Sequence, residues 1–342
     1  MRGRGVRRAV ALGRYPRRVI DALTSLVAPI GRLADAELLT GGQFATTYRV
    51  TLADGERVVV KTAPVGTDGL LTYEHDLLRA EALVYGLAAQ RPALLMPQVL
   101  HTDFSRTLLP SDALVVSHLP GVPWVDAGFG PASSDPRTVR AERETGAVLA
   151  ALHAIDGPAY GYPCGRQESS WASSFGAMID ELLDDAARWS VPVPADEVRA
   201  ALETHRHVLD DVARPSLVHT DLWAGNVFVD PVTGEVVGII DPERAFWGDP
   251  LADLVGIDPM GREPGTPAVL EGYGPLDVDS PSARARLELY RMRLCLVMMI
   301  EITPRKFDGD WVEPHRAAVT ANLHAALASL HGRDDVGAPA GR

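Results

Sequence analysis

The residues best suited to chemistry lie in the segment 216–230, where Asp221 and Asn226 stand five positions apart between two short apolar runs. A carboxylate can orient a hydroxyl that attacks a phosphate, and an amide oxygen can bind Mg²⁺. A third group, Asp241, follows the apolar run 236–240, so a hairpin would bring it close to Asn226. Either aspartate alone could simply cap a turn. The order and spacing of the three together predict a magnesium-dependent phosphoryl-transfer site.

Two differently built parts of the chain must position these groups. The first is rich in β-branched residues and has one long apolar-striped helix at 69–89. The second follows Leu119-Pro120-Gly121, is mainly helical, and is interrupted by the hairpin runs 227–229 and 236–240. The expected strands of the first part are residues 37–40, 46–52, 57–62, 98–103 and 113–118. The expected helices of the second are 137–155, 171–189, 195–212, 283–303 and 311–331, with a loop or short helix at 261–281.

A family resemblance rests on two motifs: H-T-D-L-W-A-G-N at residues 219–226 and I-I-D-P-E-R-A-F-W-G-D-P-L-A-D-L from residue 239. Over about residues 35–330 the chain resembles the aminoglycoside phosphotransferase and fructosamine kinase superfamily. The resemblance implies an α+β, bilobal protein-kinase-like fold with ATP between the lobes. It implies that Asp221 is the catalytic aspartate and that Asn226 and Asp241 are Mg²⁺ ligands. Supporting residues on this basis are His219, Glu243 and Asp249, with Asp253 as a second structural aspartate of the motif.

The resemblance also assigns nucleotide-binding residues in the first part. Lys61, which follows three valines, would pair the α- and β-phosphates, although such a lysine could also be a strand-end surface charge. We expect Glu81, rather than Glu74, to be its partner. The remaining expected contacts with ATP are the loop residues Gly41, Gly42, Gln43 and Phe44 and the backbone groups of Ser117 and Leu119.

Two departures from the resemblance concern the catalytic motif. The family commonly has glycine where this chain has Thr220, and Pro242-Glu243 replaces the Phe-Gly of protein kinases. The second departure argues against a protein kinase. Neither removes a group that the reaction needs.

Charge and composition limit the classes of partner. The formal net charge is −12 although residues 1–20 contain seven arginines and no acid, so the rest of the chain is strongly acidic. This argues against a nucleic-acid partner. Two distant cysteines and the absence of a long apolar run predict a cytoplasmic protein with no membrane partner. The expected divisions are a basic arm and short helix at 1–34, an ATP-binding lobe at 35–118, a catalytic lobe at 119–332 and a disordered tail at 333–342. The oligomeric state stays open.

The acceptor is a small molecule that the sequence does not identify. Candidate contacts are Asp180, Glu181, Asp184 and Trp247, although the acids could equally be the solvated face of a helix. One hypothesis is resistance to an aminoglycoside or related glycosylated or nucleoside antibiotic. The second is a metabolic kinase for an aminosugar, a glycated amine or an amino alcohol. The third is a nucleotide-binding scaffold without turnover, against which the intact set Lys61, Asp221, Asn226 and Asp241 argues.

Overall fold

The computed structural model describes residues 15–39 and 44–337, with side chains to residue 332, and has the mixed α+β composition expected from the sequence. The contacts divide the chain into two compact units. The first holds residues up to 67 together with 97–119, and the second holds residues 68–96 and those from 120 onward. Residues 68–96, which the sequence placed in the ATP-binding lobe, therefore group with the helical unit. Each unit is described by itself below.

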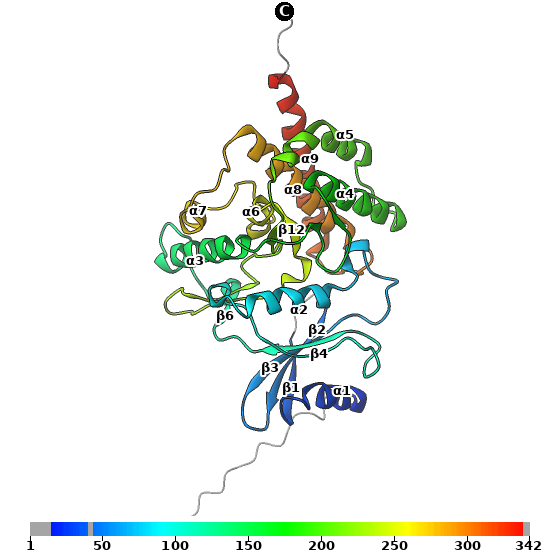
Figure 1. The fold of residues 1–342 in the computed structure, drawn as a ribbon, viewed down its shortest axis with the longest axis vertical. Coiled ribbons are helices and arrows are strands. Elements are labelled where there is room, and N and C mark those ends of the chain that lie inside the picture. The colour runs from blue at the N-terminus through cyan, green and yellow to red at the C-terminus, as the bar shows by residue number, and fades with distance from the viewer. Residues whose placement is uncertain (1–14, 40–43, 338–342) are drawn as a thin grey trace, which may run out of the picture. The chain divides into compact units, whose positions relative to one another are not determined.

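The first unit is a five-stranded antiparallel sheet covered by one helix (Figure 1). Helix α1 (Arg17–Val27) buries Leu23, Leu26 and Val27 against the apolar residues of the strands. Gly55, at φ 97°, allows the tight turn between the second and third strands. In the order β1-β2-β3-β5-β4, the strands are β1 (Leu33–Leu39), β2 (Thr46–Leu52), β3 (Arg57–Thr62), β5 (Ala113–Ser117) and β4 (Val99–Asp103).

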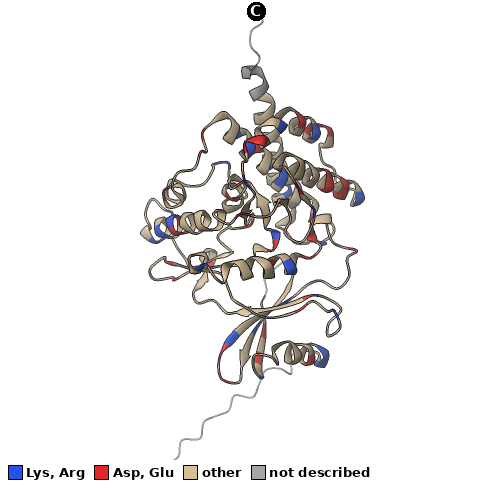
Figure 2. Cartoon of the chain, in the orientation of Figure 1, with Lys and Arg blue, Asp and Glu red and all other residues tan. Residues whose placement is uncertain are grey.

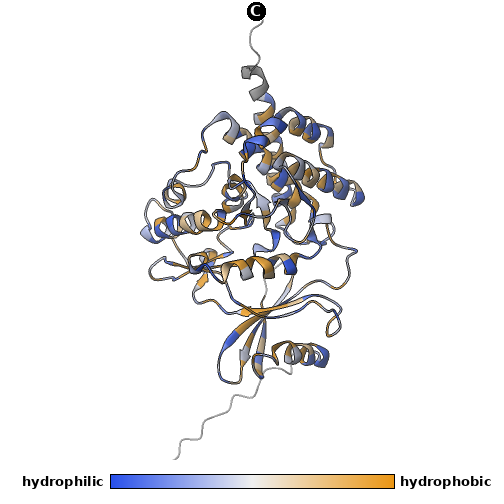
Figure 3. Cartoon of the chain, in the orientation of Figure 1, coloured by the Kyte–Doolittle hydropathy of each residue, from blue (hydrophilic) through white to orange (hydrophobic). Residues whose placement is uncertain are grey.

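The second unit is mainly helical, and charged residues of both signs are scattered along its outer helices (Figure 2). Four of the helices begin at a side chain that accepts a backbone N–H, namely Asp135, Ser170, Thr266 and Ser280. Helix α2 is largely apolar (Figure 3) and buries most of its length. The helices are α2 (Leu77–Ala88), α3 (Pro136–His153), α4 (Trp171–Arg188), α5 (Ala195–His205), α6 (Leu251–Ile257), α7 (Pro267–Tyr273), α8 (Pro281–Ile300) and α9 (Val312–Gly337).

Two small sheets in this unit hold the loop 219–226. In one, β10 (Val227–Val229) pairs with β11 (Val236–Ile239) and with β6 (Val122–Pro123). In the other, β9 (Ser216–Val218) pairs with β12 (Phe246–Gly248), which continues to β7 (Tyr160–Gly161) and β8 (Gln167–Glu168). The loop thus leaves one sheet and enters the other, which fixes both of its ends.

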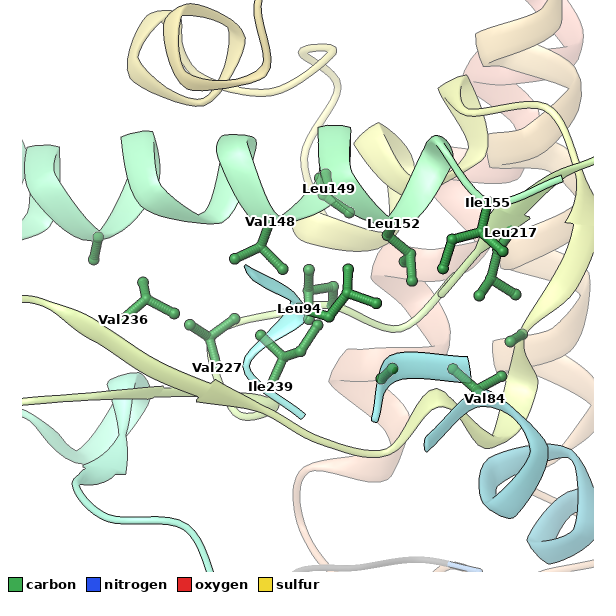
Figure 4. Close-up of a cluster of buried hydrophobic side chains, with 14 of the residues drawn as sticks. Val84, Leu94, Val148, Leu149, Leu152, Ile155, Leu217, Val227, Val236 and Ile239 are labelled. Carbon is green, nitrogen blue, oxygen red and sulfur yellow. The ribbon is translucent and has the colours of Figure 1, made fainter. Parts of the chain in front are cut away.

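A buried apolar cluster fills the space between α3 and the hairpin β10–β11 (Figure 4). Val148, Leu149 and Leu152 of α3 pack toward Val227 and Ile239 of the hairpin. Burial of an aliphatic side chain contributes roughly 1.5–3 kcal/mol. Apolar packing against α3 therefore stabilises the position of the hairpin that carries Asn226 and Asp241 at its ends.

Several elements differ from the sequence predictions. Strand β1 begins at Leu33, before the expected strand 37–40, and α9 runs to Gly337, so residues 333–337 of the tail predicted to be disordered are helical. Helix α2 begins only at residue 77, after Asp76 in a left-handed conformation (φ 63°). The helix expected over 195–212 ends at His205 and tightens into a 3₁₀ segment, Arg206–Asp211. The segment 261–281, predicted to be a loop or short helix, contains the short helix α7, which agrees with that prediction. Among the described residues, no helix is both long and apolar enough to cross a membrane.

Candidate active site

Asp221 and Asn226 belong to one closed loop. The Asn226 side-chain nitrogen Nδ2 donates to the Asp221 carbonyl oxygen at 2.7 Å, and the Asn226 N–H donates to the Trp223 carbonyl at 2.9 Å. Because a carbonyl oxygen only accepts, the first bond leaves Asn226 Oδ1 available as a ligand. The Asp221 carboxylate is partly buried and makes no hydrogen bond with any residue that the structure describes. The side chain of Asp221 therefore contributes no hydrogen bond to the folding of the loop.

His219 connects this loop to the backbone before Asp241. Its Nε2 lies 2.9 Å from the Ile240 carbonyl oxygen, and its Nδ1 lies 3.3 Å from the Asp221 backbone nitrogen. The carbonyl must accept and the N–H must donate, so His219 carries its proton on Nε2 and accepts at Nδ1. The Ile240 N–H also donates to the Asn226 carbonyl at 3.0 Å. Asp221, Asn226 and Asp241 are thereby brought to one region, as the sequence predicted from the hairpin.

Asp253 is the residue that braces the loop. Its buried carboxylate accepts from the backbone N–H groups of His219 (2.9 Å) and Thr220 (2.5 Å) and lies 2.8 Å from His153 Nε2. Burial by itself would raise the pKa of Asp253, but the bonds from His153 and His219 outweigh it and lower that pKa. Asp249 has another role, because it accepts from Leu251 N–H, Tyr290 and Arg286. It connects the start of α6 to α8 and makes no bond to the loop.

Thr220 stands in a left-handed conformation, with φ 67°, immediately before Asp221. A β-branched residue is disfavoured there, whereas glycine would adopt this conformation without strain. Two bonds offset the strain: the N–H donates to Asp253, and the hydroxyl donates to the Arg244 carbonyl at 3.0 Å. Gly256 packs directly under this turn, and a Cβ there would lie 2.6 Å from the Thr220 carbonyl oxygen.

Arg244 is a largely buried cation that the sequence reasoning did not single out. Its guanidinium donates to Glu301 at 2.9 Å and lies 6.0 Å from the ring centroid of Tyr73. Burial raises the pKa of Asp221, and the positive charge of Arg244 partly offsets that rise. The arginine therefore helps to keep Asp221 ionised.

Arg244→Met is expected to shift the acidic limb of the kcat/KM pH profile to higher pH. Protonation removes the charge of Asp221, and loss of a nearby cation raises the pKa of that carboxyl further. The measurement is kcat/KM against pH at a temperature where the variant is folded. Arg214→Met is the control, because Arg214 forms an exposed ion pair with Asp156. An unchanged limb in Arg244→Met would contradict the assignment of this limb to Asp221.

Asn226 and Asp241 form a donor set that fits Mg²⁺. Both offer oxygen atoms, and oxygen ligands are the ones that this hard cation prefers. Asn226 Oδ1 has no hydrogen bond within the described chain, and Asp241 follows the residue bonded to Asn226 across the hairpin. No cluster of three or more His, Cys, Asp or Glu side chains suited to a metal occurs among the described residues, so an amide ligand would be needed here.

Asp241→Ala is expected to weaken ATP binding in the presence of Mg²⁺ by about 10- to 100-fold, with little change in its absence. Calorimetric titration of ATP with Mg²⁺ and with EDTA measures both values. Asp241 is left-handed (φ 61°), and alanine would add backbone strain. Asp241→Asn is therefore the matched variant, because asparagine tolerates this conformation. If both variants bind MgATP like the wild type, Asp241 is not a metal ligand.

Glu81 and Glu74 bind different partners within the second unit. Glu81 is fully buried on α2 and accepts from the Tyr85 hydroxyl at 2.7 Å. Glu74 accepts from the Leu71 N–H at 2.8 Å and forms an ion pair with Arg305. Glu74 is thus tied to the segment after α8, which leaves Glu81 as the glutamate of α2. Tyr85, which also accepts from the Asp241 N–H at 3.2 Å, was not foreseen.

The predicted nucleotide-binding residues of the first unit lie on or beside its sheet. Lys61 is largely buried on β3, where it pairs with Thr47 and Leu114. The Ser117 N–H already donates to the Gln98 carbonyl at 2.9 Å, whereas the Leu119 backbone makes no hydrogen bond with described residues. Phe44 is half-buried before β2. Gly41, Gly42 and Gln43 lie outside the described residues.

The four candidate acceptor contacts separate by burial. Asp180 and Asp184 are exposed on α4, and Trp247 is buried in the apolar cluster that includes Val227 and Ile239, with a Gly157 Cβ position 2.3 Å from its ring. Glu181 lines a cavity, which has a volume of about 160 Å³ and also reaches Glu243. Glu181 is half-buried and makes no hydrogen bond or ion pair with a described residue, and burial raises its pKa.

Aromatic rings form one wall of this cavity. Tyr73 and Tyr162 are stacked, with ring centroids 6.1 Å apart and planes 19° apart. Arg293 holds Tyr162 in place by donating to its hydroxyl at 2.9 Å. Arg166, the basic residue of the lining, is paired with Glu168 at 2.7 Å. The cavity therefore combines a flat apolar wall with an unpaired carboxylate.

Comparison with known proteins decides the family. The sequence profile of the phosphotransferase enzyme family (APH) matches residues 35–290, which is most of the chain. The chain belongs to this family. The match itself does not specify an acceptor.

Solved structures agree on the fold. A Thermobifida fusca protein assigned as a fructosamine-3-kinase superposes with a TM-score of 0.65 at 24% identity, covering 92% of this chain and all of that one. Aminoglycoside phosphotransferase APH(4)-Ia gives a TM-score of 0.59 at 20% identity, covering 94% of this chain and all of the other. At these identities the likeness shows the kinase-like fold of the family and no substrate.

Curated relatives are longer proteins. Acyl-CoA dehydrogenase family member 10 of Mus musculus is 25% identical over 265 residues, which are 76% of this chain and 23% of the mouse protein. Acyl-CoA dehydrogenase family member 11 of Gallus gallus is 26% identical over 240 residues, 28% of its length. The chain thus spans about a quarter of these relatives, and their names describe proteins of which it matches only a part.

Proposed function

We propose that this phosphotransferase moves the γ-phosphoryl group of ATP to a hydroxyl of an amine-bearing small molecule, with Asp221 as the catalytic carboxylate. The observation that carries the proposal is the Asp221 side chain, which is partly buried and has no hydrogen-bond partner among the described residues. The backbone around it is held by bonds of the His219 and Thr220 N–H groups and of the Asp221 N–H and carbonyl. A carboxylate held in this way is available to a substrate hydroxyl.

The roles of the residues follow from their chemistry. Asp221 accepts the hydrogen of the acceptor hydroxyl and orients its oxygen for attack. Asn226 and Asp241 would hold Mg²⁺, which when bound neutralises charge on the phosphate oxygens. His219 and Asp253 keep the loop in place through their backbone bonds. Lys61, a largely buried strand lysine, is proposed to pair with the phosphates as in related kinases.

The proposed acceptor class rests on Glu181. A half-buried carboxylate that makes no hydrogen bond or ion pair with a described residue lines the same cavity as a stacked tyrosine pair, which suits an ammonium group carried on a flat ring or sugar. The first candidate is an antibiotic of the aminoglycoside or related glycosylated or nucleoside type, which the enzyme would inactivate. The second is an aminosugar, glycated amine or amino alcohol of metabolism, favoured by the D-L-W-A-G-N motif.

Mass spectrometry of a mixed pool tests the proposal. Aminoglycosides, nucleoside antibiotics, aminosugars and glycated amines are incubated with ATP, Mg²⁺ and enzyme, with Asp221→Ala as the control. A product that gains one phosphoryl group only with the wild type would establish the reaction and its acceptor class. Tight ATP binding without any product from the amine-bearing pool would count against this acceptor class and favour a nucleotide-binding scaffold.

Glu181→Gln supplies the matched test of the acceptor contact. If Glu181 binds the amine, this variant should raise KM for the acceptor and leave KM for ATP unchanged. Asp184→Gln is the control, because Asp184 is exposed on the same helix.

A further inference from the structure

Tyr85 occupies an unusual place in the second unit, because its hydroxyl contacts both the glutamate of α2 and the backbone of the candidate metal ligand. The oxygen lies 2.7 Å from Glu81 Oε1 and 3.2 Å from the Asp241 nitrogen. Glu81 and Tyr85 are four residues apart, so they share one face of the helix. Both side chains are buried, at 0% and 1% exposure.

The direction of both bonds is fixed by chemistry. The Asp241 N–H can only donate, so the Tyr85 oxygen accepts there, and its single proton is left to donate to Glu81. Burial raises the pKa of Tyr85 well above its usual value, and the charges of Glu81 and Asp241 raise it further.

The backbone at Asp241 needs such support. Its φ of 61° places a non-glycine residue in the left-handed region. The preceding peptide is held from the loop side, where Ile240 N–H donates to the Asn226 carbonyl and the Ile240 carbonyl accepts from His219. Tyr85 holds the next N–H from the side of α2. Asp241 is thus fixed between the catalytic loop and the helix.

We propose that Tyr85 is a positioning residue that ties the metal-binding aspartate to α2 and thereby sets Asp241 and Glu81 at a constant spacing. This inference rests on the proposed role of Asp241 as a Mg²⁺ ligand. Since residues 68–96 belong to the second unit, the two acids are held by contacts inside that unit. The hydroxyl acts through Asp241 and does not itself contact the substrate.

Tyr85→Phe removes this one oxygen and keeps the ring. We expect the Mg²⁺ concentration needed for half-maximal ATP binding to rise by about tenfold, while ATP binding without Mg²⁺ stays unchanged. Calorimetric ATP titrations over a series of Mg²⁺ concentrations measure this and need no acceptor. Wild-type protein without any Mg²⁺-dependent ATP binding would refute the proposed function itself. A normal wild type with an unaltered Tyr85→Phe would refute only the role of Tyr85.

Tyr160→Phe is the matched control for loss of a buried hydroxyl. Tyr160 belongs to the same unit, and its hydroxyl donates to the Val212 carbonyl at 2.8 Å. We expect it to lower the melting temperature without moving the Mg²⁺ dependence. An equal shift in both variants would overturn the inference, since it would reflect general destabilisation.

Amide hydrogen exchange on the wild type tests the same contact without any variant. The Asp241 amide, bonded to a buried hydroxyl, should exchange as slowly as the neighbouring Ile240 amide. Exchange of the Asp241 amide at the rate of an unprotected amide would show that the bond to Tyr85 does not persist.

Discussion

Asp221→Asn is expected to lower kcat for phosphoryl transfer by about 10²- to 10⁴-fold, the usual contribution of a positioned acid or base. The amide keeps the shape of the side chain but cannot accept a proton from the acceptor hydroxyl. ATP binding should change little, because Asn226 and Asp241 keep their oxygens. Steady-state kinetics on the acceptor found in the pool assay, with ATP binding measured separately, checks both statements.

Asp230→Asn is the control that separates a catalytic aspartate from a turn aspartate. Asp230 follows the same hairpin strand, and its carboxylate accepts from the Val232 and Thr233 N–H groups at 2.8 and 2.9 Å. Asparagine commonly makes the same turn, so kcat should be unchanged. If both substitutions had the same small effect, Asp221 would also be a turn residue and the catalytic assignment would fail.

The catalytic motif could be predicted from the sequence because its parts are close together in the chain. Asp221 and Asn226 share one loop, and the hairpin returns the chain to Asp241 after a turn whose residues are recognisable. Alternation of apolar residues also predicted the strands 46–52 and 57–62, which β2 and β3 confirm. Local spacing determines these features.

Other roles depend on contacts that local spacing does not contain. Glu74 and Glu81 lie on the same predicted helix, and what separates them is an arginine 231 residues away that binds Glu74. Asp249 and Asp253 are four residues apart in one motif, yet only Asp253 reaches the loop. Trp247, a candidate acceptor contact in the sequence, is packed in the core. Each of these outcomes is set by tertiary packing.

The aspartates of the motif therefore differ in the number of hydrogen bonds that their carboxylates accept from the protein. Asp253 and Asp249 are saturated with bonds from the protein, whereas the carboxylate of Asp221 has none among the described residues. A buried acid with filled hydrogen bonds stabilises the fold, and one without them is poised for a ligand. Substitution of a saturated aspartate should therefore reduce stability, whereas substitution of Asp221 should reduce kcat. The variants Asp253→Asn and Asp249→Asn test the first expectation.

Asp253→Asn is expected to destabilise the protein by on the order of 1–3 kcal/mol for each buried donor that loses its charged acceptor. An amide nitrogen cannot accept, so in either orientation it faces a donor, either Thr220 N–H or the His219 and His153 group. Chemical denaturation measures the change. The lowered pKa of Asp253 stabilises the wild type above the pKa of the unfolded carboxyl, and this contribution disappears as the pH falls through the folded pKa.

The same substitution should lower kcat by about 10²-fold in the protein that remains folded, because in either orientation of the amide one of the backbone bonds that hold His219 and Thr220 is lost and Asp221 moves. Asp249→Asn is the matched control, since that side chain is equally buried but bonds only to α6 and α8. It should lose stability and keep its kcat. A comparable fall in kcat for Asp249→Asn would mean that the loop responds to general loosening of the unit, and that Asp253 has no specific role in placing Asp221.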